Sequence, residues 1–209
     1  MAKRSLMKRK DTMSLDGLWQ LDGQDIIVPY PPQAKKSLFK GNIQEEMTYM
    51  KDFKRSDWSK GRIFLCFGAV DQIADVYLND VFLIHHEDGY LPFEAEVTDL
   101  LKEDNVVKAI CKDALDKTYP YGKQTKEPKG MWYTPVSFIW QSVYLEHRGE
   151  HYIQDLKIST DMQKVSLEVK GNFDELTLVI DQDDVHFKRS YTTKTMTIDL
   201  KALGLPRHL

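Results

Sequence analysis

Apolar and polar residues alternate in short runs along most of this sequence, and this alternation predicts β-strands. Residues 61–70 (GRIFLCFGAV) are apolar on both alternating faces, which is typical of a strand in the middle of a sandwich. Residues 75–78 and 81–84 flank Asn79-Asp80, a polar pair that favours a tight hairpin turn. No long segment repeats its apolar residues with the period of a helix. The sequence therefore predicts an all-β fold.

The remaining strands of the first part follow the same pattern. Residues 46–54 predict a strand whose Met47, Tyr49 and Phe53 face the core, and further strands are expected at residues 106–111 and 142–145. Residues 98–101 indicate a single helical turn. Residues 22–45 hold three prolines and predict a surface connection.

The pattern changes near residues 147–150, which indicates a domain boundary. Beyond it, period-two runs at residues 152–158, 164–170, 175–180 and 192–198 predict a second β-sandwich. An immunoglobulin-like domain needs about 100 residues, and only about 60 remain, so this sandwich is expected to be incomplete. The predicted organisation is a basic N-terminal tail (1–14), a first sandwich (15–147) and an incomplete second sandwich (150–209).

Composition and charge narrow the function. The 209 residues carry a net charge of −3, which favours neither nucleic acid nor an anionic membrane as a partner. No apolar segment approaches the ~20 residues of a membrane helix, and the basic start lacks the apolar run of a secretory signal. Cys66 and Cys111 lie in apolar strands without a metal-binding spacing, so we expect two buried free thiols and a cytoplasmic location. A disulfide between neighbouring strands is the alternative.

The acidic and histidine pairs offer little chemistry. Glu45-Glu46, Glu94 with Glu96, and the acidic group Asp181, Asp183 and Asp184 are all expected to be solvated surface carboxylates. His85 and His86 are adjacent on a strand and point to opposite faces, so they are not expected to bind one metal ion. The sequence therefore predicts neither a metal site nor a cofactor.

Several segments, in order, carry a family resemblance. They are residues 15–21 (LDGLWQL), 47–58, 64–78 (FLCFGAVDQIADVYL), 86–93 (HEDGYLPF), 105–110, 122–124 (GKQ) and 132–146, which ends IWQSVYLE. Together they resemble the N-terminal region of glycoside hydrolase family 2, the family of β-galactosidases, β-glucuronidases and β-mannosidases. The resemblance implies a jelly-roll, galactose-binding-like β-sandwich over residues 15–147, then the start of an immunoglobulin-like sandwich. In the intact enzyme a (β/α)₈ barrel would follow as the C-terminal partner domain of the same chain.

The resemblance also implies where the chemistry lies. Retaining glycosidases of this family use two glutamates on barrel strands, so no catalytic residue is expected in these 209 residues, and the chain alone is expected to be inactive. Loops of the jelly roll would instead help wall the pocket for a terminal β-glycoside. The matching positions are Lys123 and Gln124, which offer hydrogen bonds to hydroxyls, and Trp132 and Tyr133, which offer aromatic faces. The alternative is that Trp132, Tyr133 and Trp140 pack in the sandwich core or against another domain.

One departure from the family pattern and three functional hypotheses remain. Phe138 stands where the family has glycine, so either the turn differs or its backbone is unstrained. The first hypothesis is a non-catalytic N-terminal part of a β-galactosidase-like hydrolase. The second is a standalone carbohydrate-binding or interaction module, and the third is a non-catalytic family member. Exposed strand edges of an incomplete sandwich would favour a homo-oligomer.

Overall fold

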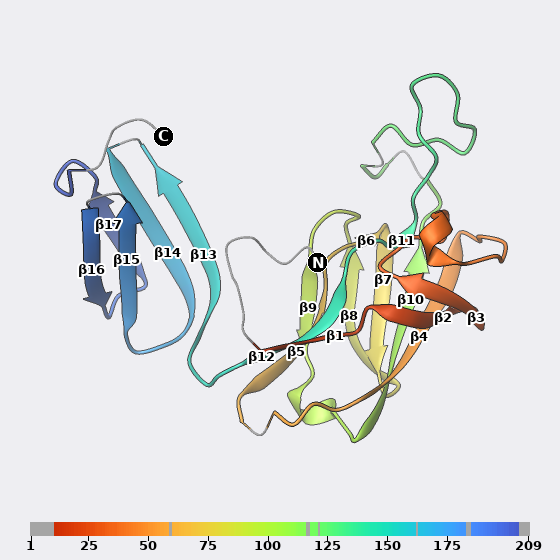
Figure 1. Ribbon diagram of the computed structural model, residues 1–209, viewed down its shortest axis with the longest axis horizontal. Helices are drawn as coiled ribbons and strands as arrows, with labels where there is room; N and C mark the ends of the chain where they lie inside the picture. The colour runs from red at the N-terminus through yellow and green to blue at the C-terminus, as the bar shows by residue number, and fades with distance from the viewer. Residues whose placement is uncertain are drawn as a thin grey trace. The chain divides into compact units, whose positions relative to one another are not determined.

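The computed structural model describes residues 11–58, 60–115, 118–120, 122–161, 163–182 and 185–204. It divides into two compact units, Met1–Arg148 and Gly149–Leu209. The described residues form strands joined by loops and two single-turn 3-10 helices, η1 (Lys35–Ser37) and η2 (Thr98–Leu100), so the predicted all-β class is confirmed (Figure 1). In the part of the chain described, no helix is long and apolar enough to span a membrane.

The first unit is a sandwich of two antiparallel sheets (Figure 1). The four-stranded sheet runs in the order β1 (Thr12–Ser14), β12 (Val143–Arg148), β5 (Arg62–Phe67) and β9 (Phe93–Glu96). The six-stranded sheet runs in the order β3 (Gln24–Val28), β2 (Gly17–Leu21), β4 (Glu46–Lys54), β10 (Asp104–Lys112), β7 (Ile73–Leu78) and β8 (Val81–Glu87). A short ladder joins β6 (Val70–Asp71) to β11 (Phe138–Ile139).

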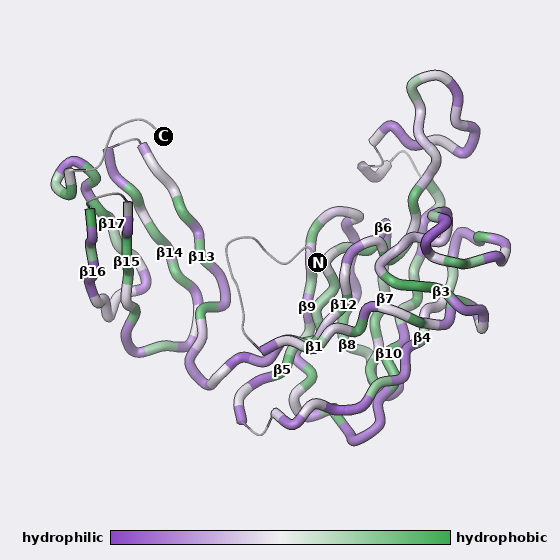
Figure 2. Tube along the Cα trace, viewed as in Figure 1, coloured by the Kyte–Doolittle hydropathy of each residue, from purple (hydrophilic) through white to green (hydrophobic). Residues whose placement is uncertain are grey.

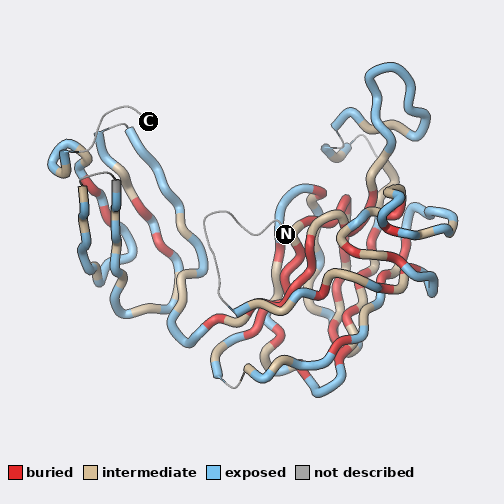
Figure 3. Tube along the Cα trace, in the orientation of Figure 1, coloured by how far each residue is buried: buried red, intermediate tan, exposed pale blue. Residues whose placement is uncertain are grey.

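The core of this unit lies between the two sheets, because each strand turns alternate side chains inward. The alternation of hydropathy in Figure 2 coincides with the buried positions on the same strands in Figure 3. Met47, Tyr49 and Phe53 of β4 are buried as predicted. The Trp19 ring packs edge-on against Tyr49, with 6.3 Å between ring centroids, and its indole N–H donates to the Leu15 carbonyl at 2.7 Å. Each large side chain buried in this way stabilises the fold by ~1.5–3 kcal/mol.

Strand β5 is covered on both faces, as its apolar sequence predicts. Leu65 and Phe67 face the core, and Phe64 and Cys66 on the opposite face are also buried. Both cysteines of the chain are buried and free, so the prediction of two thiols is confirmed.

The predicted hairpin is present between β7 and β8. Asn79 and Asp80 both take positive φ angles, 51° and 66°, which is the geometry of the turn that favours such residues. The Asn79 side chain donates to the Leu100 carbonyl at 2.9 Å and accepts from the Val106 N–H at 3.0 Å. The hairpin is therefore fixed to the start of β10.

Two predictions for the N-terminal half need correction. Thr12–Ser14 belongs to strand β1, which pairs with β12, rather than to a basic tail, because Met13 packs against the core. Residues 1–10 of the predicted tail lie outside the described residues. The predicted surface connection after residue 22 contains strand β3, whose Ile26 and Val28 are buried.

The structure explains how Phe138 replaces the glycine of the family pattern. Its φ angle is 71°, so the backbone keeps the left-handed conformation that glycine would favour. Its ring is fully buried and packs edge-on against Tyr49, with 6.4 Å between ring centroids. The turn is therefore retained, and burial of the ring offsets the backbone strain.

The second unit has its own small core. A three-stranded sheet contains β13 (Tyr152–Thr160), β14 (Lys164–Asn172) and β17 (Thr195–Asp199), and a two-stranded sheet contains β15 (Leu176–Gln182) and β16 (Val185–Tyr191). Leu167, Val169 and Met196 form its buried cluster. Strand β16 was not predicted, because charged residues interrupt its alternation. The immunoglobulin-like assignment of this unit stays a prediction.

Candidate functional site

Residues 122–136, called here the aromatic loop, precede β11 and extend away from the sandwich (Figure 1). Backbone hydrogen bonds close the base of this loop. The Tyr133 N–H donates to the Lys123 carbonyl at 2.8 Å, and the Thr125 N–H donates to the Tyr133 carbonyl at 3.1 Å. These contacts bring together the two parts of the chain that hold the four predicted substrate-binding residues.

Trp132 and Tyr133 are exposed on this loop. Their relative exposures are 47% and 67%, and neighbouring Met131 is exposed as well. Within the first unit, neither ring belongs to the sandwich core, so packing in that core is excluded for both residues, and packing against another domain stays a prediction. Trp140 differs, because it is half-buried, its indole N–H donates to the Gly89 carbonyl at 2.8 Å, and its ring packs edge-on against Tyr90.

Gln124 and Lys123 lie side by side in sequence but in different environments. Gln124 is half-buried, and its side-chain oxygen accepts the Val136 N–H. Its side-chain NH₂ group donates a hydrogen bond to the Asp71 carboxyl group on β6. Lys123 is exposed. Gln124 therefore joins the base of the aromatic loop to the sandwich, and Lys123 faces solvent beside it.

Asp71 is the titratable residue that sequence reasoning missed. It is only 5% exposed. Burial raises the pKa of the Asp71 carboxyl to about 7, the neighbouring Asp113 carboxylate adds to the rise, and the Gln124 hydrogen bond opposes it. The sequence signal that could have revealed it is the Val70-Asp71 pair inside the segment FLCFGAVDQIADVYL, which was used for the resemblance and not for chemistry.

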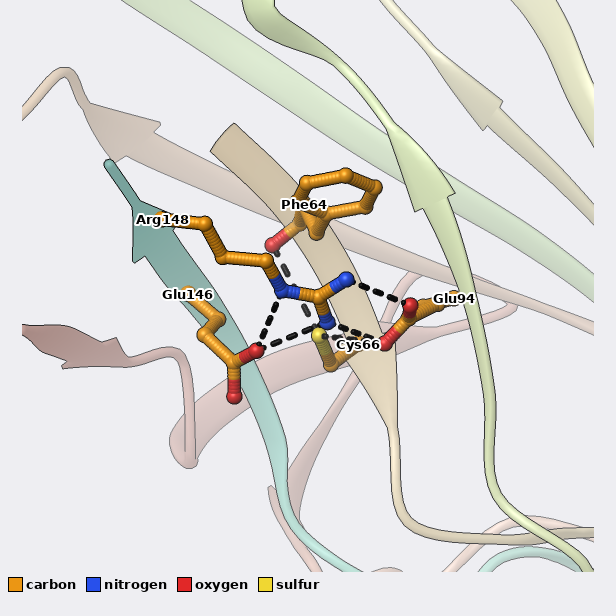
Figure 4. Close-up of polar contacts among 5 residues, drawn as sticks. All are labelled: Phe64, Cys66, Glu94, Glu146 and Arg148. Atoms are coloured by element: carbon orange, nitrogen blue, oxygen red, sulfur yellow. Dashed lines mark hydrogen bonds and ion pairs between the residues drawn. The ribbon is translucent and has the colours of Figure 1, made fainter. Parts of the chain in front are cut away.

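A second cluster of functional groups lies on the outer face of the four-stranded sheet (Figure 4). Cys66, Glu94 and Glu146 each offer a ligand atom within 4.8 Å of the others. Arg148 fills the space between the two carboxylates. Its guanidinium donates to both Glu94 oxygens, at 2.8 and 2.5 Å, and to Glu146 at 2.7 Å.

This arrangement is an ion-pair cluster and does not fit a metal centre. The Arg148 side chain is 1% exposed, and its guanidinium carbon lies 3.8 Å from the centroid of the Phe64 ring. A bound cation would have to displace this guanidinium from both carboxylates. The prediction of a solvated Glu94 is therefore wrong. Strands β9 and β12 flank β5, and this arrangement brings Glu94 beside Arg148.

The other predicted groups behave as surface residues. Glu45, Glu46, Glu96 and Asp181 are exposed, and Asp183 and Asp184 lie outside the described residues. The His86 ring stacks on Phe93 at 4.1 Å, and exposed His85 contacts Asp75 at 2.6 Å. The two histidines therefore have separate surroundings, as their adjacent strand positions predict.

The fold and the anchored loop define an all-β, galactose-binding-like sandwich that projects exposed aromatic residues. Residues 29–153 match the family model described as glycosyl hydrolase 2 galactose-binding domain-like. The chain belongs to this family.

Related proteins agree with this assignment. A beta-galactosidase of Thermoanaerobacter pseudethanolicus is 28% identical over 138 residues, which span 62% of this chain and 18% of that protein. A beta-glucuronidase of Rattus norvegicus is 26% identical over 148 residues, which span 58% of this chain and 23% of that protein. This chain therefore spans about a fifth of the length of these relatives.

Solved structures of beta-glucuronidases share this fold. The structure of a beta-glucuronidase from Faecalibacterium prausnitzii aligns with a TM-score of 0.65 and 20% identity, covering 95% of this chain and 42% of that one. At this identity the likeness establishes the fold alone. The family match and the related sequences together show that this chain corresponds to the N-terminal region of family 2 glycosidases.

Proposed function

We propose that this chain is the non-catalytic N-terminal part of a retaining family 2 glycoside hydrolase, and that its aromatic loop contacts the substrate. The observation that carries the proposal is the pair Trp132 and Tyr133, exposed on a loop whose base is tied to the sandwich through Gln124. Exposed aromatic rings are costly to leave in water and suit the apolar face of a sugar ring. The names of the relatives, beta-galactosidase and beta-glucuronidase, support a terminal β-glycoside as the substrate.

Each residue of the loop has a separate role in this proposal. Trp132 and Tyr133 stack on the sugar, and the Lys123 ammonium donates hydrogen bonds to its hydroxyls. The Gln124 amide holds the loop base through Asp71 and the Val136 N–H, although direct contact of Gln124 with the sugar stays a prediction. The catalytic carboxyl groups would lie on a barrel domain of the same polypeptide.

The carboxylates of Glu94 and Glu146 do not suit catalysis. A retaining glycosidase needs two carboxyl groups about 5–5.5 Å apart, one of them able to release a proton to the leaving group. Glu94 and Glu146 are close enough, but the buried Arg148 guanidinium bonds to both. The guanidinium occupies the space between the two carboxylates, which are mostly buried, and this supports a structural role.

The test compares the KM values of variants of the full polypeptide that the source cell makes. Trp132→Ala and Tyr133→Ala are expected to raise KM for nitrophenyl β-galactoside or β-glucuronide by about tenfold, the range of one lost stacking contact. Phe82→Ala removes an exposed aromatic ring from β8 and serves as the matched control with unchanged KM. Unchanged kinetics in both loop variants would overturn the proposal, and a sugar-binding polypeptide without turnover would favour the standalone binding module.

Location and assembly belong to the same proposal. Two buried free thiols support a cytoplasmic protein. The outer strands of the second unit's three-stranded sheet, β13 and β17, support self-association through edge pairing. Sedimentation of the purified chain would measure this association.

A further inference from the structure

A separate pocket lies where β7 begins and β10 ends, at one end of the six-stranded sheet. Its volume is about 230 Å³, and its walls include Gln72, Ile73, Lys112, Asp113, Leu115 and Tyr119. Ile73 and Lys112 point away from the core, since their strand neighbours Ala74 and Cys111 are fully buried. The pocket therefore opens on the outer side of the sheet, and neither Trp132 nor Tyr133 lines it.

Gln72 is the polar residue just before β7 that lines this pocket. The residue is only 6% exposed. Its backbone is satisfied, because its N–H donates to the Lys112 carbonyl at 3.2 Å and its carbonyl accepts the Asp88 N–H at 3.1 Å. Its side-chain amide makes no hydrogen bond with any residue that the structure describes. The amide is not among the side-chain groups that are both buried and unpartnered, so solvent reaches it and a ligand with hydroxyl groups can pair with it.

The rest of the wall combines polar and apolar groups. Asp113 uses Oδ1 to accept the Leu115 N–H at 2.9 Å, and its buried Oδ2 has no partner among the described residues. The Lys112 ammonium is more than half exposed and lies 3.5 Å from Glu46. Tyr119 and Leu115 supply aromatic and aliphatic surface. The pocket thus offers an acceptor, an amide and a cation beside an apolar wall.

This combination fits a sugar ring better than a wholly apolar or a wholly charged ligand. A pyranose has hydroxyls that pair with amide and carboxylate groups, and a C–H face that packs on an aromatic ring. Pockets for drug-sized ligands span about 300–1,000 Å³, so this smaller volume suits one ring. We propose that the pocket bounded by Gln72, Asp113 and Tyr119 binds a single pyranose unit, as a second carbohydrate site on this chain.

The experiment titrates the 209-residue chain with methyl β-galactoside and, separately, with methyl β-glucuronide, and follows binding by NMR. Saturable shifts are expected, and Gln72→Ala should weaken binding about tenfold through the lost hydrogen bonds. Tyr119→Ala, a loop substitution distant from the core, should weaken binding as well and serves if Gln72→Ala fails to fold. Phe82→Ala, which removes an exposed ring of β8 outside the pocket, should leave binding unchanged and serves as the matched control. Shifts that are lost in Trp132→Ala alone would report the aromatic loop and not the pocket.

The outcomes are distinct. Loss of binding in Trp132→Ala with retention in Gln72→Ala and Tyr119→Ala would overturn the pocket and leave the proposed function standing. Absence of saturable binding for both sugars would also overturn it. A preference for the glucuronide that disappears in Lys112→Met would support the pocket and assign the carboxylate of the sugar to Lys112.

Discussion

Phe138 combines a costly backbone with a fully buried ring. Phe138→Ala is expected to lower the free energy of unfolding by about 3–5 kcal/mol, because it empties the space against Tyr49. Phe138→Gly should be about 1 kcal/mol more stable than Phe138→Ala, because glycine adopts φ of 71° without strain. Urea unfolding followed by tryptophan fluorescence checks this order, since all four tryptophans precede residue 148. If Phe138→Gly were less stable than Phe138→Ala, this result would contradict backbone strain at position 138.

Arg148 holds two carboxylates together inside the first unit. Arg148→Met leaves Glu94 and Glu146 buried without their cation, and we expect a loss of about 3–5 kcal/mol in the free energy of unfolding. Arg62→Met is the matched control, because Arg62 pairs with Glu96 at 3.3 Å on the exposed surface and should cost at most about 1 kcal/mol. Equal losses in the two variants would contradict a buried cluster.

Asp71 makes the stability of the first unit depend on pH. Its pKa is raised from 3.8 to about 7, chiefly by burial. Between these values the folded chain retains a proton that the unfolded chain releases, so its contribution to the free energy of unfolding falls as pH rises through this window. Asp71→Asn removes this titratable group, so its free energy of unfolding should not fall in this window. The free energy of unfolding of the variant minus that of the original chain should therefore increase from pH 4 to pH 8. A pH-independent difference between the two unfolding curves would refute the shift.

At the scale of the elements, the aromatic loop depends on one side chain at its base. Gln124→Ala removes the acceptor of the Val136 N–H and the contact with Asp71. Amide exchange at Val136, Thr125 and Tyr133 should therefore become faster, while strand β4 keeps its protection. Lys126→Ala, which removes only an exposed pair with Glu45, is the control. Unchanged exchange at Val136 in the Gln124 variant would show that the loop is held by other contacts.

The elements that the sequence predicted are those with clear alternation. Strand β4 and the β7–β8 hairpin follow directly from apolar periodicity and turn residues. Strand β11 has two residues and forms only because Phe138 and Ile139 pair with β6, a contact between distant segments that periodicity cannot reveal. Glu94 was misjudged for the same reason, because its partner Arg148 lies 54 positions away.

The candidate site was predictable in part. The resemblance directed attention to Lys123, Gln124, Trp132 and Tyr133, and backbone hydrogen bonds bring the two segments together. The exposure of the rings and the inward direction of the Gln124 side chain required the structure. Asp71 could not be recognised as special from sequence, since its raised pKa arises from burial between β6, Gln124 and Asp113.

At the scale of the whole molecule, the two units differ in how much they can do alone. The first has an extensive core between two sheets and carries both the aromatic loop and the Gln72 pocket. The second has a small buried cluster on two short sheets. A polypeptide in which the first unit contacts sugar and another domain performs hydrolysis accounts for both the family match and the ion-paired carboxylates.

The most direct test of this account is a hydrolysis assay on the purified 209-residue chain. Nitrophenyl β-galactoside and β-glucuronide would be incubated with the folded chain across the pH range, and nitrophenol release would be measured. The account predicts no release above the buffer rate, because it assigns the acid and the nucleophile to a separate barrel domain. Steady turnover that Asp71→Asn abolishes would contradict it and would locate catalysis within the sandwich.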